Sequence, residues 1–456
     1  MIEVYDPGNG ELVGSVPSAS REDVENVLAT ASKAADIARN MPAHLRMSVL
    51  RDVAEQLRQR HEEFAEVIAK EGVKTIREAR KEVTRCVETL RISAEEARRL
   101  GGEIIAFDQM PGSENRFGYY KRLPVGVIVA IPPYNDPLHL VAHKIGPAIA
   151  AGNAVILKPH SSTPLSAKKL VDLFDATELP TGVLQLITGA GAVIGDQLVS
   201  DPRVRMVSFT GGPLVGHRIL AQAGLKKIGM ELGGNCPCIV LGDANMDLAV
   251  ESTVSGAFWA AGQNCLHVQR IYIQKDHFDD FSERFVTLTQ RMKVGDKMDE
   301  ATDMGPMIND AAALKISEFV ADAVALGARI LTGGECVGRY YQPTVLDNVS
   351  ADCRISKEEV FGPVVALYPF GEISAAIDLA NDVDYGLQAG VFTRDLATAH
   401  RIADGLNCGG VMINDSSDFR IDAMPFGGTR GSGLGKEGVV HAIHEMTELK
   451  TYCFNL

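Results

Sequence analysis

Two segments of the chain carry side chains that could perform acyl chemistry. Cys265 ends the run Gly262-Gln263-Asn264-Cys265, which is rich in small residues and precedes an apolar stretch. A cysteine thiolate is a strong nucleophile, although an isolated cysteine is more often an inert core residue. Glu231 lies in Met230-Glu231-Leu232-Gly233-Gly234-Asn235. Burial in such an apolar turn would raise the pKa of the carboxyl group toward neutrality, which suits a general base.

A third segment places an amide in a rigid turn. Asn135 lies in Ile131-Pro132-Pro133-Tyr134-Asn135-Asp136-Pro137. An amide held between prolines could donate a hydrogen bond to a developing oxyanion, whereas an asparagine in a turn is by itself ordinary. The three segments together favour Cys265 as a nucleophile, Asn135 as an oxyanion donor and Glu231 as a base.

The composition limits the classes of partner. The chain has 456 residues, of which 46% are hydrophobic and 23% charged, with a net charge of -14. This balance is typical of a globular protein with a large core, and the acidity argues against a nucleic-acid partner. No stretch approaches the roughly 20 apolar residues that a membrane-spanning helix requires, and the first residues do not resemble a signal peptide.

The eight cysteines show no regular spacing and no CxxC pair. In a long chain without a signal peptide, this pattern predicts reduced thiols and a cytoplasmic location. Cys236-Pro237-Cys238 is the one close pair, and it lies in an apolar run without a nearby histidine or third cysteine. We interpret it as a buried strand rather than a metal site, and we expect no metal.

The elements that must hold these residues alternate between strand and helix. After a mainly helical stretch to about residue 100, capped at its start by Ser20 with Asp23, short apolar runs at 125–131, 154–157, 183–187 and 204–209 are separated by helical segments. A second series includes 238–241, 270–273 and 364–368. Such runs are typical of parallel sheets covered on both faces. They predict two doubly wound α/β domains with an active site in the cleft between them.

Five motifs, taken together and in order, closely resemble the aldehyde dehydrogenase superfamily over nearly the whole chain. They are the Pro-Pro-Tyr-Asn135 turn, Glu231-Leu-Gly-Gly, Gly-Gln-Asn-Cys265, Glu358-Glu359-Val360-Phe361-Gly362-Pro363 and Pro425-Phe426-Gly427-Gly428. The resemblance implies that Cys265 captures an aldehyde, that Asn135 and the Cys265 backbone N–H hold the oxyanion, and that hydride leaves for a nicotinamide. Glu231 would then activate water to release the acid from a thioester. Arg270 matches a family arginine that we interpret as structural.

The same resemblance implies a site for NAD or NADP. Lys158 is similar to the lysine that binds the adenosine ribose, and Glu359 and Phe361 match residues around the nicotinamide ribose and ring. The pyrophosphate would lie at the helix that follows Phe209, Thr210, Gly211 and Gly212. Ile131, Pro133, Tyr134, His160, Ser161, Gly191 and Leu232 complete the predicted cofactor contacts. The glycines at 189, 191 and 195 have GxGxxxG spacing, which is too weak a signal to assign the phosphates to them.

Two departures from the family pattern concern this cofactor. Gly212 stands where the family usually has serine, so one side-chain contact to phosphate is absent. Ser161 stands where the family often has a glutamate that accepts hydrogen bonds from the ribose hydroxyls and repels a 2′-phosphate. Ser161, beside His160, removes that repulsion. We therefore expect that NADP+ is accepted and even preferred.

The predicted substrate pocket is polar. Asp136, His139 and His143 follow the Asn135 turn, and a loop at 415–422 with Arg420 should form the opposite wall. Arg420 could anchor a carboxylate, sulfonate or phosphate, while Asp136 with a histidine could accept an ammonium or hydroxyl group. Alternatively, Arg420 pairs with Asp418 or Asp422 and only shapes its loop. The pocket suggests a small hydrophilic aldehyde such as an amino acid semialdehyde. The other predicted pocket residues are Trp259, Asn264, Ser417, Phe419 and Phe426.

By resemblance, the fold has three parts. Residues 1–107, 124–230 and 432–439 would form a discontinuous cofactor-binding domain, 231–431 a catalytic domain, and 108–123 with 440–456 an oligomerisation arm. The strand at 449–454 lacks an obvious partner, so we expect it to pair with another subunit in a homodimer or homotetramer. Two alternatives stay open: a CoA-acylating dehydrogenase, against which Glu231 argues, and a non-catalytic relative, which would need none of these side chains. A thiol hydrolase would leave Glu359 and Phe361 unexplained.

Overall fold

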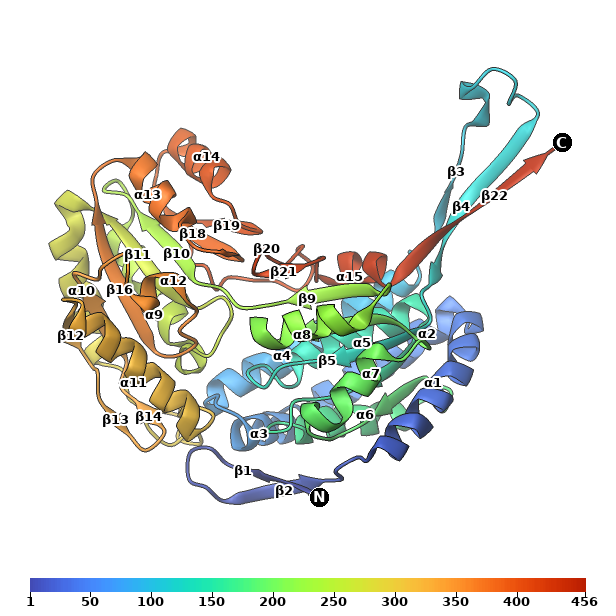
Figure 1. Cartoon of the computed structure of the whole chain (residues 1–456), viewed down its shortest axis with the longest axis horizontal. Helices are drawn as coiled ribbons and strands as arrows, with labels where there is room; N and C mark the ends of the chain where they lie inside the picture. Colours follow the sequence, from blue (N-terminus) through green and yellow to red (C-terminus); the bar gives the residue numbers. More distant parts are fainter.

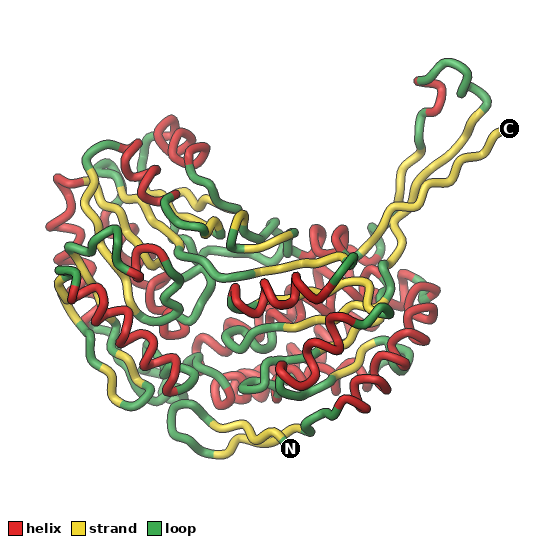
Figure 2. Tube along the Cα trace, viewed as in Figure 1, coloured by secondary structure: helices red, strands yellow, loops and turns green.

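The computed structural model describes residues 1–456. Figure 1 shows two α/β units beside each other and a long arm that projects from one of them. In Figure 2 the helices lie around the strands of each unit, as expected for sheets that are covered on both faces. The predicted α/β architecture is confirmed. No helix has the combination of length and apolar character that crossing a bilayer demands.

The first unit is built on a six-stranded sheet of order β21-β9-β8-β5-β6-β7. All neighbours are parallel except β21, which runs antiparallel to β9. The strands are β5 (Val127–Ile131), β6 (Ala154–Leu157), β7 (Leu184–Leu186), β8 (Val204–Thr210), β9 (Lys227–Glu231) and β21 (Gly433–Leu434). The four apolar runs predicted between residues 125 and 209 are β5 to β8. The side chains of β5, β6 and β8 are buried almost throughout, because helices cover both faces of the sheet, whereas β7 at the sheet edge is partly buried.

Nine helices surround this sheet: α1 (Arg21–Asn40), α2 (Ala43–Gln59), α3 (His61–Glu71), α4 (Ile76–Ala97), α5 (His139–Ala151), α6 (Leu165–Asp175), α7 (Asp196–Ser200), α8 (Pro213–Ala223) and α15 (Val439–Glu445). Ser20 and Asp23 form the predicted cap of α1, each side chain bonding the other residue's backbone N–H. Helix α4 packs against α2 and α5 in the largest apolar cluster of the chain. A hairpin of β1 (Ile2–Tyr5) and β2 (Leu12–Val16) precedes α1.

The second unit is built on a seven-stranded sheet of order β12-β15-β16-β11-β10-β18-β19. Only β12 runs antiparallel to its neighbour. The strands are β10 (Cys236–Val240), β11 (Val268–Gln274), β12 (Arg329–Thr332), β15 (Thr344–Asp347), β16 (Val364–Phe370), β18 (Gln388–Phe392) and β19 (Gly410–Ile413). The runs predicted at 238–241, 270–273 and 364–368 are β10, β11 and β16. Cys236 and Cys238 lie buried in β10, as predicted.

The helices of this unit are α9 (Met246–Phe258), α10 (Phe278–Gln290), α11 (Asp310–Ala325), α12 (Arg354–Lys357), α13 (Ile373–Asn381) and α14 (Leu396–Gly405). Two short pairs lie at its edges: β13 (Cys336–Val337) with β14 (Tyr340–Tyr341), and β17 (Tyr385–Gly386) with β20 (Thr429–Arg430). The guanidinium of Arg270 is buried and donates to the backbone carbonyls of Asn235, Leu379 and Ala380. These bonds fit its structural interpretation.

The arm is an antiparallel sheet of β3 (Gly102–Ile104), β4 (Arg116–Pro124) and β22 (Thr447–Asn455). The last strand pairs with β4 of the same chain along its whole length, from Thr447 opposite Pro124 to Asn455 opposite Arg116. It therefore has a partner within its own chain, which the sequence prediction missed. The outer edge of β22 is unpaired in the sheet order. Residues 439–445 are helix α15, which packs on α5 in the first unit and lies outside the arm sheet.

Candidate active site

A cavity of about 520 Å³ lies between the two units. Four parallel strands of the first unit end at it, because Ile131 closes β5, Lys158 follows β6, Thr210 closes β8 and Glu231 closes β9. The carboxyl ends of parallel strands share one edge of the sheet, which is where ligands bind in such folds. The second unit contributes Cys265 and other residues to the opposite wall. The volume is in the range of roughly 300–1,000 Å³ that is typical of ligand pockets.

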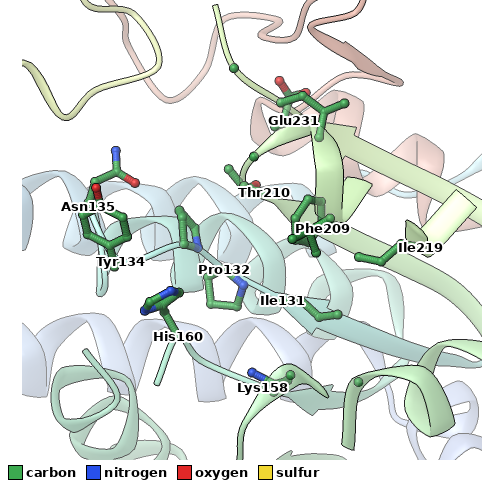
Figure 3. Close-up of a pocket in the computed structure, with 18 of the residues that line it drawn as sticks. Ile131, Pro132, Tyr134, Asn135, Lys158, His160, Phe209, Thr210, Ile219 and Glu231 are labelled. Atoms are coloured by element: carbon green, nitrogen blue, oxygen red, sulfur yellow. The ribbon is translucent and has the colours of Figure 1, made fainter. Parts of the chain in front are cut away.

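Every residue predicted to be catalytic or to contact the cofactor lines this cavity. They are Cys265, Glu231, Asn135, Ile131, Pro133, Tyr134, Lys158, His160, Ser161, Gly191, Phe209, Thr210, Gly211, Gly212, Leu232, Glu359 and Phe361. Figure 3 shows many of them together, with Asn135 and Glu231 in its upper half and Lys158 near the bottom. The structure thus brings together side chains that are up to 230 positions apart in the sequence.

Cys265 is half-buried on the loop between α9 and β11. Three consecutive residues before Cys265 on this loop have positive φ: Ala260 at 50°, Ala261 at 54° and Gly262 at 65°. Left-handed alanines are strained, so their surroundings must hold them in place. Burial raises the pKa of the Cys265 thiol well above its usual range, and Arg420 is the group that most opposes this shift.

The Asn135 turn follows β5 and is anchored from several sides. Asn135 itself is buried, and the Tyr134 hydroxyl donates to Gln263 Oε1 on the cysteine loop at 3.3 Å. Asp136 forms an ion pair with the buried Lys74. The Asn135 amide therefore sits on a turn that is fastened both to the first unit and to the loop that carries Cys265.

Glu231 is buried, and its Oε2 has no hydrogen-bond partner. Burial raises its pKa well above the usual value, and the nearby charge of Glu437 raises it further. Glu437 has the opposite character. Burial disfavours its charge, but Lys144 at 3.2 Å and Arg420 at 3.3 Å outweigh that effect and hold its pKa at about 2. Of these two neighbouring carboxyl groups, Glu231 is therefore the better proton acceptor.

The far end of the cavity has the features of a phosphate site. Helix α8 begins directly after Gly211 and Gly212. No side chain caps the helix start, because the cap residue is Gly212, and the buried Thr210 hydroxyl has no partner. A Cβ at Gly212 would meet no heavy atom within 4 Å, so the backbone here is open to a ligand. Backbone N–H groups at a helix N-terminus favour an anion. These residues fit the pyrophosphate of a dinucleotide.

The side chains predicted to bind the two riboses lie at two points along the same cavity. Lys158 has only the Pro159 carbonyl as a partner, at 3.3 Å, and the Ser161 hydroxyl donates to Gly189 O. Glu359 accepts a hydrogen bond from Gly234 N at 3.0 Å, and burial raises its pKa to about 7. Phe361 has a positive φ of 53° and meets the Tyr134 ring edge-on at 5.9 Å between centroids. Lys158 and Glu359 therefore keep free hydrogen-bonding capacity.

Two of the predicted substrate residues, His139 and His143, belong to a buried cluster with Asp422. His139 and His143 lie on one face of α5, as predicted, and their Nε2 atoms are 2.9 Å and 3.2 Å from Asp422 Oδ1. Arg85 donates to the same oxygen at 2.8 Å. Burial lowers the pKa of both histidines, so they are neutral near pH 7. Asp422 was expected only as a possible partner of Arg420, and this cluster was not foreseen.

Two expectations about charge pairing are corrected. The ion-pair partner of Asp136 is Lys74, which Asp136 shares with Glu82, and not a histidine. Arg420 pairs with Glu437, and not with Asp418 or Asp422. Asp418 accepts from Ser416, while Asp422 is engaged by the two histidines and Arg85, so neither is left for Arg420.

Arg420 is held loosely for a buried cation. Its side chain is only 5% exposed, and its Nε has no partner. Its contacts with Glu437 and with His143 Nε2 are long, at 3.3 Å and 3.4 Å. Its guanidinium carbon lies 3.7 Å from the centre of the Phe426 ring. Arg420 therefore has hydrogen-bonding capacity left for a ligand near Cys265.

The other predicted pocket residues have mixed surroundings. Phe426 is buried beside Cys265, and the buried Ser417 hydroxyl donates to Leu266 O, on the residue after the cysteine. Asn264 Oδ1 accepts from Leu266 N at 3.1 Å and lies 3.7 Å from Cys265 Sγ. Phe419 is 47% exposed, and Trp259 lies under the ammonium of Lys81 at 4.9 Å. Phe426, Ser417 and Asn264 thus contact Cys265 or its loop directly.

Sequence reasoning missed several residues of the site. Lys144 and Glu437 act on Glu231, yet Lys144 lies inside an apolar helix and Glu437 in a glycine-rich loop, and neither belongs to a recognised motif. Arg218, which is paired with Asp196, and Lys315 also line the cavity. No local pattern marks them, since their role depends on the fold around them.

The model of the aldehyde dehydrogenase family matches residues 1–452. Aspartate-semialdehyde dehydrogenase 1 of Pseudomonas canavaninivorans is 50% identical over all of this chain and 97% of its own length. 3-Sulfolactaldehyde dehydrogenase of Priestia aryabhattai is 44% identical over all of this chain and 95% of its own length.

Among solved structures, glyceraldehyde-3-phosphate dehydrogenase of Methanocaldococcus jannaschii, complexed with NADP, matches with a TM-score of 0.96 and 39% identity. The match covers 100% of this chain and 99% of that one. Other structural relatives are complexed with NAD+. With these matches and the site geometry, the chain belongs to the aldehyde dehydrogenase family and is an NAD(P)+-dependent aldehyde dehydrogenase.

Proposed function

We propose that this enzyme oxidises a small, polar aldehyde that carries an anionic group, and that it does so through a covalent intermediate on Cys265. The observation that carries the proposal is the convergence of Cys265, Asn135 and Glu231 on one cavity that also has a phosphate-binding end. A thiol, an amide donor and a raised-pKa carboxyl group are the three groups that such a reaction needs.

The cofactor would be held by groups along the length of the cavity. The N-terminus of α8 would bind the pyrophosphate, Lys158 the adenosine ribose, and Glu359 the nicotinamide ribose. When bound there, the nicotinamide supplies a hydride acceptor. Ser161 places no negative charge beside Lys158, which supports acceptance of NADP+ as well as NAD+.

Acylation begins when the Cys265 sulfur attacks the aldehyde carbon. The thiol must lose its proton first, and Arg420 is the cation that favours the thiolate in this buried place. The new oxyanion would receive hydrogen bonds from the Asn135 amide and the Cys265 backbone N–H. Loss of hydride from the same carbon leaves a thioester on Cys265.

Deacylation requires a proton acceptor close to the thioester. Glu231 would take a proton from water, whose oxygen attacks the thioester carbon, and Cys265 leaves as the thiolate. The presence of this carboxyl group favours water over CoA as the acyl acceptor. We also propose that the arm pairs through the free edge of β22 with another subunit to form a homodimer or homotetramer.

The anionic character of the substrate rests on Arg420. It is a buried cation near Cys265 with an unpartnered Nε and two long contacts, so a carboxylate, sulfonate or phosphate could complete its bonding. The names of three relatives fit this idea, because aspartate semialdehyde, 3-sulfolactaldehyde and glyceraldehyde 3-phosphate all bear an anionic group on a short chain.

The test is a panel of short aldehydes, matched in length and with or without an anionic group, assayed with NAD+ and NADP+ in the absence of CoA. We expect the free acid as product, no turnover by Cys265→Ala, and higher kcat/KM for the anionic aldehydes. Arg420→Gln should lower kcat/KM for every aldehyde, because Arg420 also favours the Cys265 thiolate, and should lower it about 10- to 100-fold further for the anionic aldehydes, as expected for one charge-assisted hydrogen-bonding group. An equal loss for neutral aldehydes would contradict the anchoring role, and a strict requirement for CoA would contradict hydrolysis.

A further inference from the structure

Helix α4 carries two buried carboxylates that reach out of the helix to different loops. Glu78 and Glu82 are four residues apart and so lie one turn apart on the same face. Both are buried, and neither lines the cavity. Buried carboxylates cost folding free energy unless they are paired, so their bonding partners matter. Those partners lie on the two loops that carry Cys265 and Asn135.

Glu78 holds the start of the cysteine loop. Its Oε1 accepts a hydrogen bond from Ala260 N at 2.8 Å, and its Oε2 accepts one from Thr75 N at the same distance. Ala260 is the first of the three residues with positive φ that lead to Cys265. Gln263 then bonds back to the Ala260 carbonyl at 3.1 Å. A strained backbone persists only where its surroundings hold it, and Glu78 supplies part of that hold.

Glu82 holds the other side of the site. Its Oε1 accepts hydrogen bonds from Leu138 N at 2.8 Å and His139 N at 3.0 Å, at the start of α5. That helix start has no side-chain cap of its own. The Glu82 Oε2 atom accepts from Lys74 at 2.8 Å, and Lys74 also pairs with Asp136. The residues after Asn135 are thus tied to α4 through one ion-pair network.

The two sets of contacts close into a ring. From α4 the ring runs through Glu78 to Ala260 and Gln263, crosses from Gln263 to the Tyr134 hydroxyl, and passes the Asn135 turn. It returns to α4 through Asp136, Lys74 and Glu82. One rigid helix therefore sets the position of both loops, although one loop belongs to each unit.

We infer that Glu78 and Glu82, with Lys74, are positioning residues that fix the Asn135 amide relative to the Cys265 thiol. The inference rests on the proposed roles of Cys265 and Asn135. A preorganised oxyanion donor acts only if it is already in place when charge develops, and a displacement of about 1 Å can cost about 100-fold in rate. The three residues would act on the rate of acylation and leave cofactor affinity alone.

The test uses Glu82→Gln. The amide oxygen still caps α5, but the amide nitrogen faces Lys74 and breaks the ion pair, while Asp136 keeps Lys74 paired. We expect the pre-steady-state burst of NAD(P)H, which reports acylation, to slow about 10- to 100-fold. The dissociation constant of the cofactor should stay within about twofold, because Glu82 does not line the cavity.

A matched control comes from Glu71, an equally buried carboxylate that accepts bonds from Leu165 N and Ser166 N at the start of α6. Glu71→Gln disturbs the same kind of cap away from both loops. It should lower the melting temperature and leave the burst rate unchanged. If Glu71→Gln slows the burst as much as Glu82→Gln, the effect is general destabilisation and the inference is overturned.

A double-mutant cycle separates positioning from other effects. In an Asn135→Ala background, Glu82→Gln should slow the burst less than about threefold, because the amide that Glu82 positions is gone. If Glu82→Gln slows the burst by the same factor with and without Asn135, the inference is overturned while the role of Asn135 stays intact. A normal burst in Asn135→Ala alone would refute that role and the inference together. Glu78→Gln, which must give up one of its two backbone bonds, should also slow the burst at unchanged cofactor affinity, and it provides a second test if Glu82→Gln does not fold.

Discussion

Gly233 and Glu359 provide a sharp test of the proposed nicotinamide end of the site. A Cβ built on Gly233 would lie 2.6 Å from Glu359 Oε1 and closer still to Oε2. The carboxyl group must therefore retreat until the contact reaches the 3.4 Å of ordinary van der Waals distance. The open space beside it is the cavity that Glu359 lines, and we expect the carboxyl group to move there and to give up its bond from Gly234 N.

The cost of Gly233→Ala should appear on cofactor binding rather than on folding. The displaced side chain is flexible, so the protein without cofactor should keep its melting temperature within a few degrees. In the complex, Glu359 can no longer accept a hydrogen bond from the ribose in its proper place. A hydrogen bond to a charged group contributes about 1.5–3 kcal/mol, which corresponds to roughly a 10- to 150-fold weaker dissociation constant.

The measurement is a titration of NAD+ and NADP+ by calorimetry or by quenching of protein fluorescence. Gly229→Ala is the matched control, since it adds the same Cβ on β9, where the nearest atom is Met206 Cε at 3.4 Å. We expect the control to bind cofactor normally. Equal dissociation constants for Gly233→Ala and the native protein would refute the placement of the nicotinamide ribose at Glu359.

Charges near Glu231, the proposed base, and near Lys158, the proposed partner of the adenosine ribose, give two more predictions. Glu437→Gln removes the negative charge that helps to raise the pKa of Glu231, so that pKa falls and the base stays ionised to lower pH. The acid limb of the pH profile for thioester hydrolysis should move down by about one unit, and an unmoved or raised limb would contradict the coupling. Ser161→Glu places a negative charge beside Lys158 and should lower kcat/KM for NADP+ at least about 10-fold relative to NAD+. An unchanged NADP+ to NAD+ ratio in steady-state assays would show that the 2′-phosphate lies elsewhere.

Much of the cofactor cavity could be predicted from the sequence because each part follows a strand. Asn135 comes just after β5, Lys158 after β6, Thr210 ends β8 and Glu231 ends β9. Parallel strands present their carboxyl ends at one edge, so a local motif at each strand end also specifies where it lies in space. Cys265 was identified from a motif that lies in the second unit. Only the family resemblance predicted that it lies opposite the residues at these strand ends.

The substrate side could not be predicted in the same way, because its residues are paired over long separations. The helical spacing correctly put His139 and His143 on one face of α5, yet their partner Asp422 is 283 and 279 positions away. The sequence suggested the nearby aspartates as alternative partners of Arg420, whereas in the structure Arg420 pairs with Glu437. The last strand was left without a partner for a similar reason, since β4 lies more than 300 residues earlier.

The contrast between Glu231 and Glu437 shows why position in the fold decides function here. Both carboxyl groups are buried, and in isolation burial would raise the pKa of each. Lys144 and Arg420 both form ion pairs with Glu437, which stays ionised, whereas Glu231 Oε2 has no partner. The fixed negative charge of Glu437 then raises the proton affinity of Glu231. The sequence pattern around Glu231 could suggest a base, but it could not reveal this neighbouring carboxylate and its two cations, which also shift the pKa of Glu231.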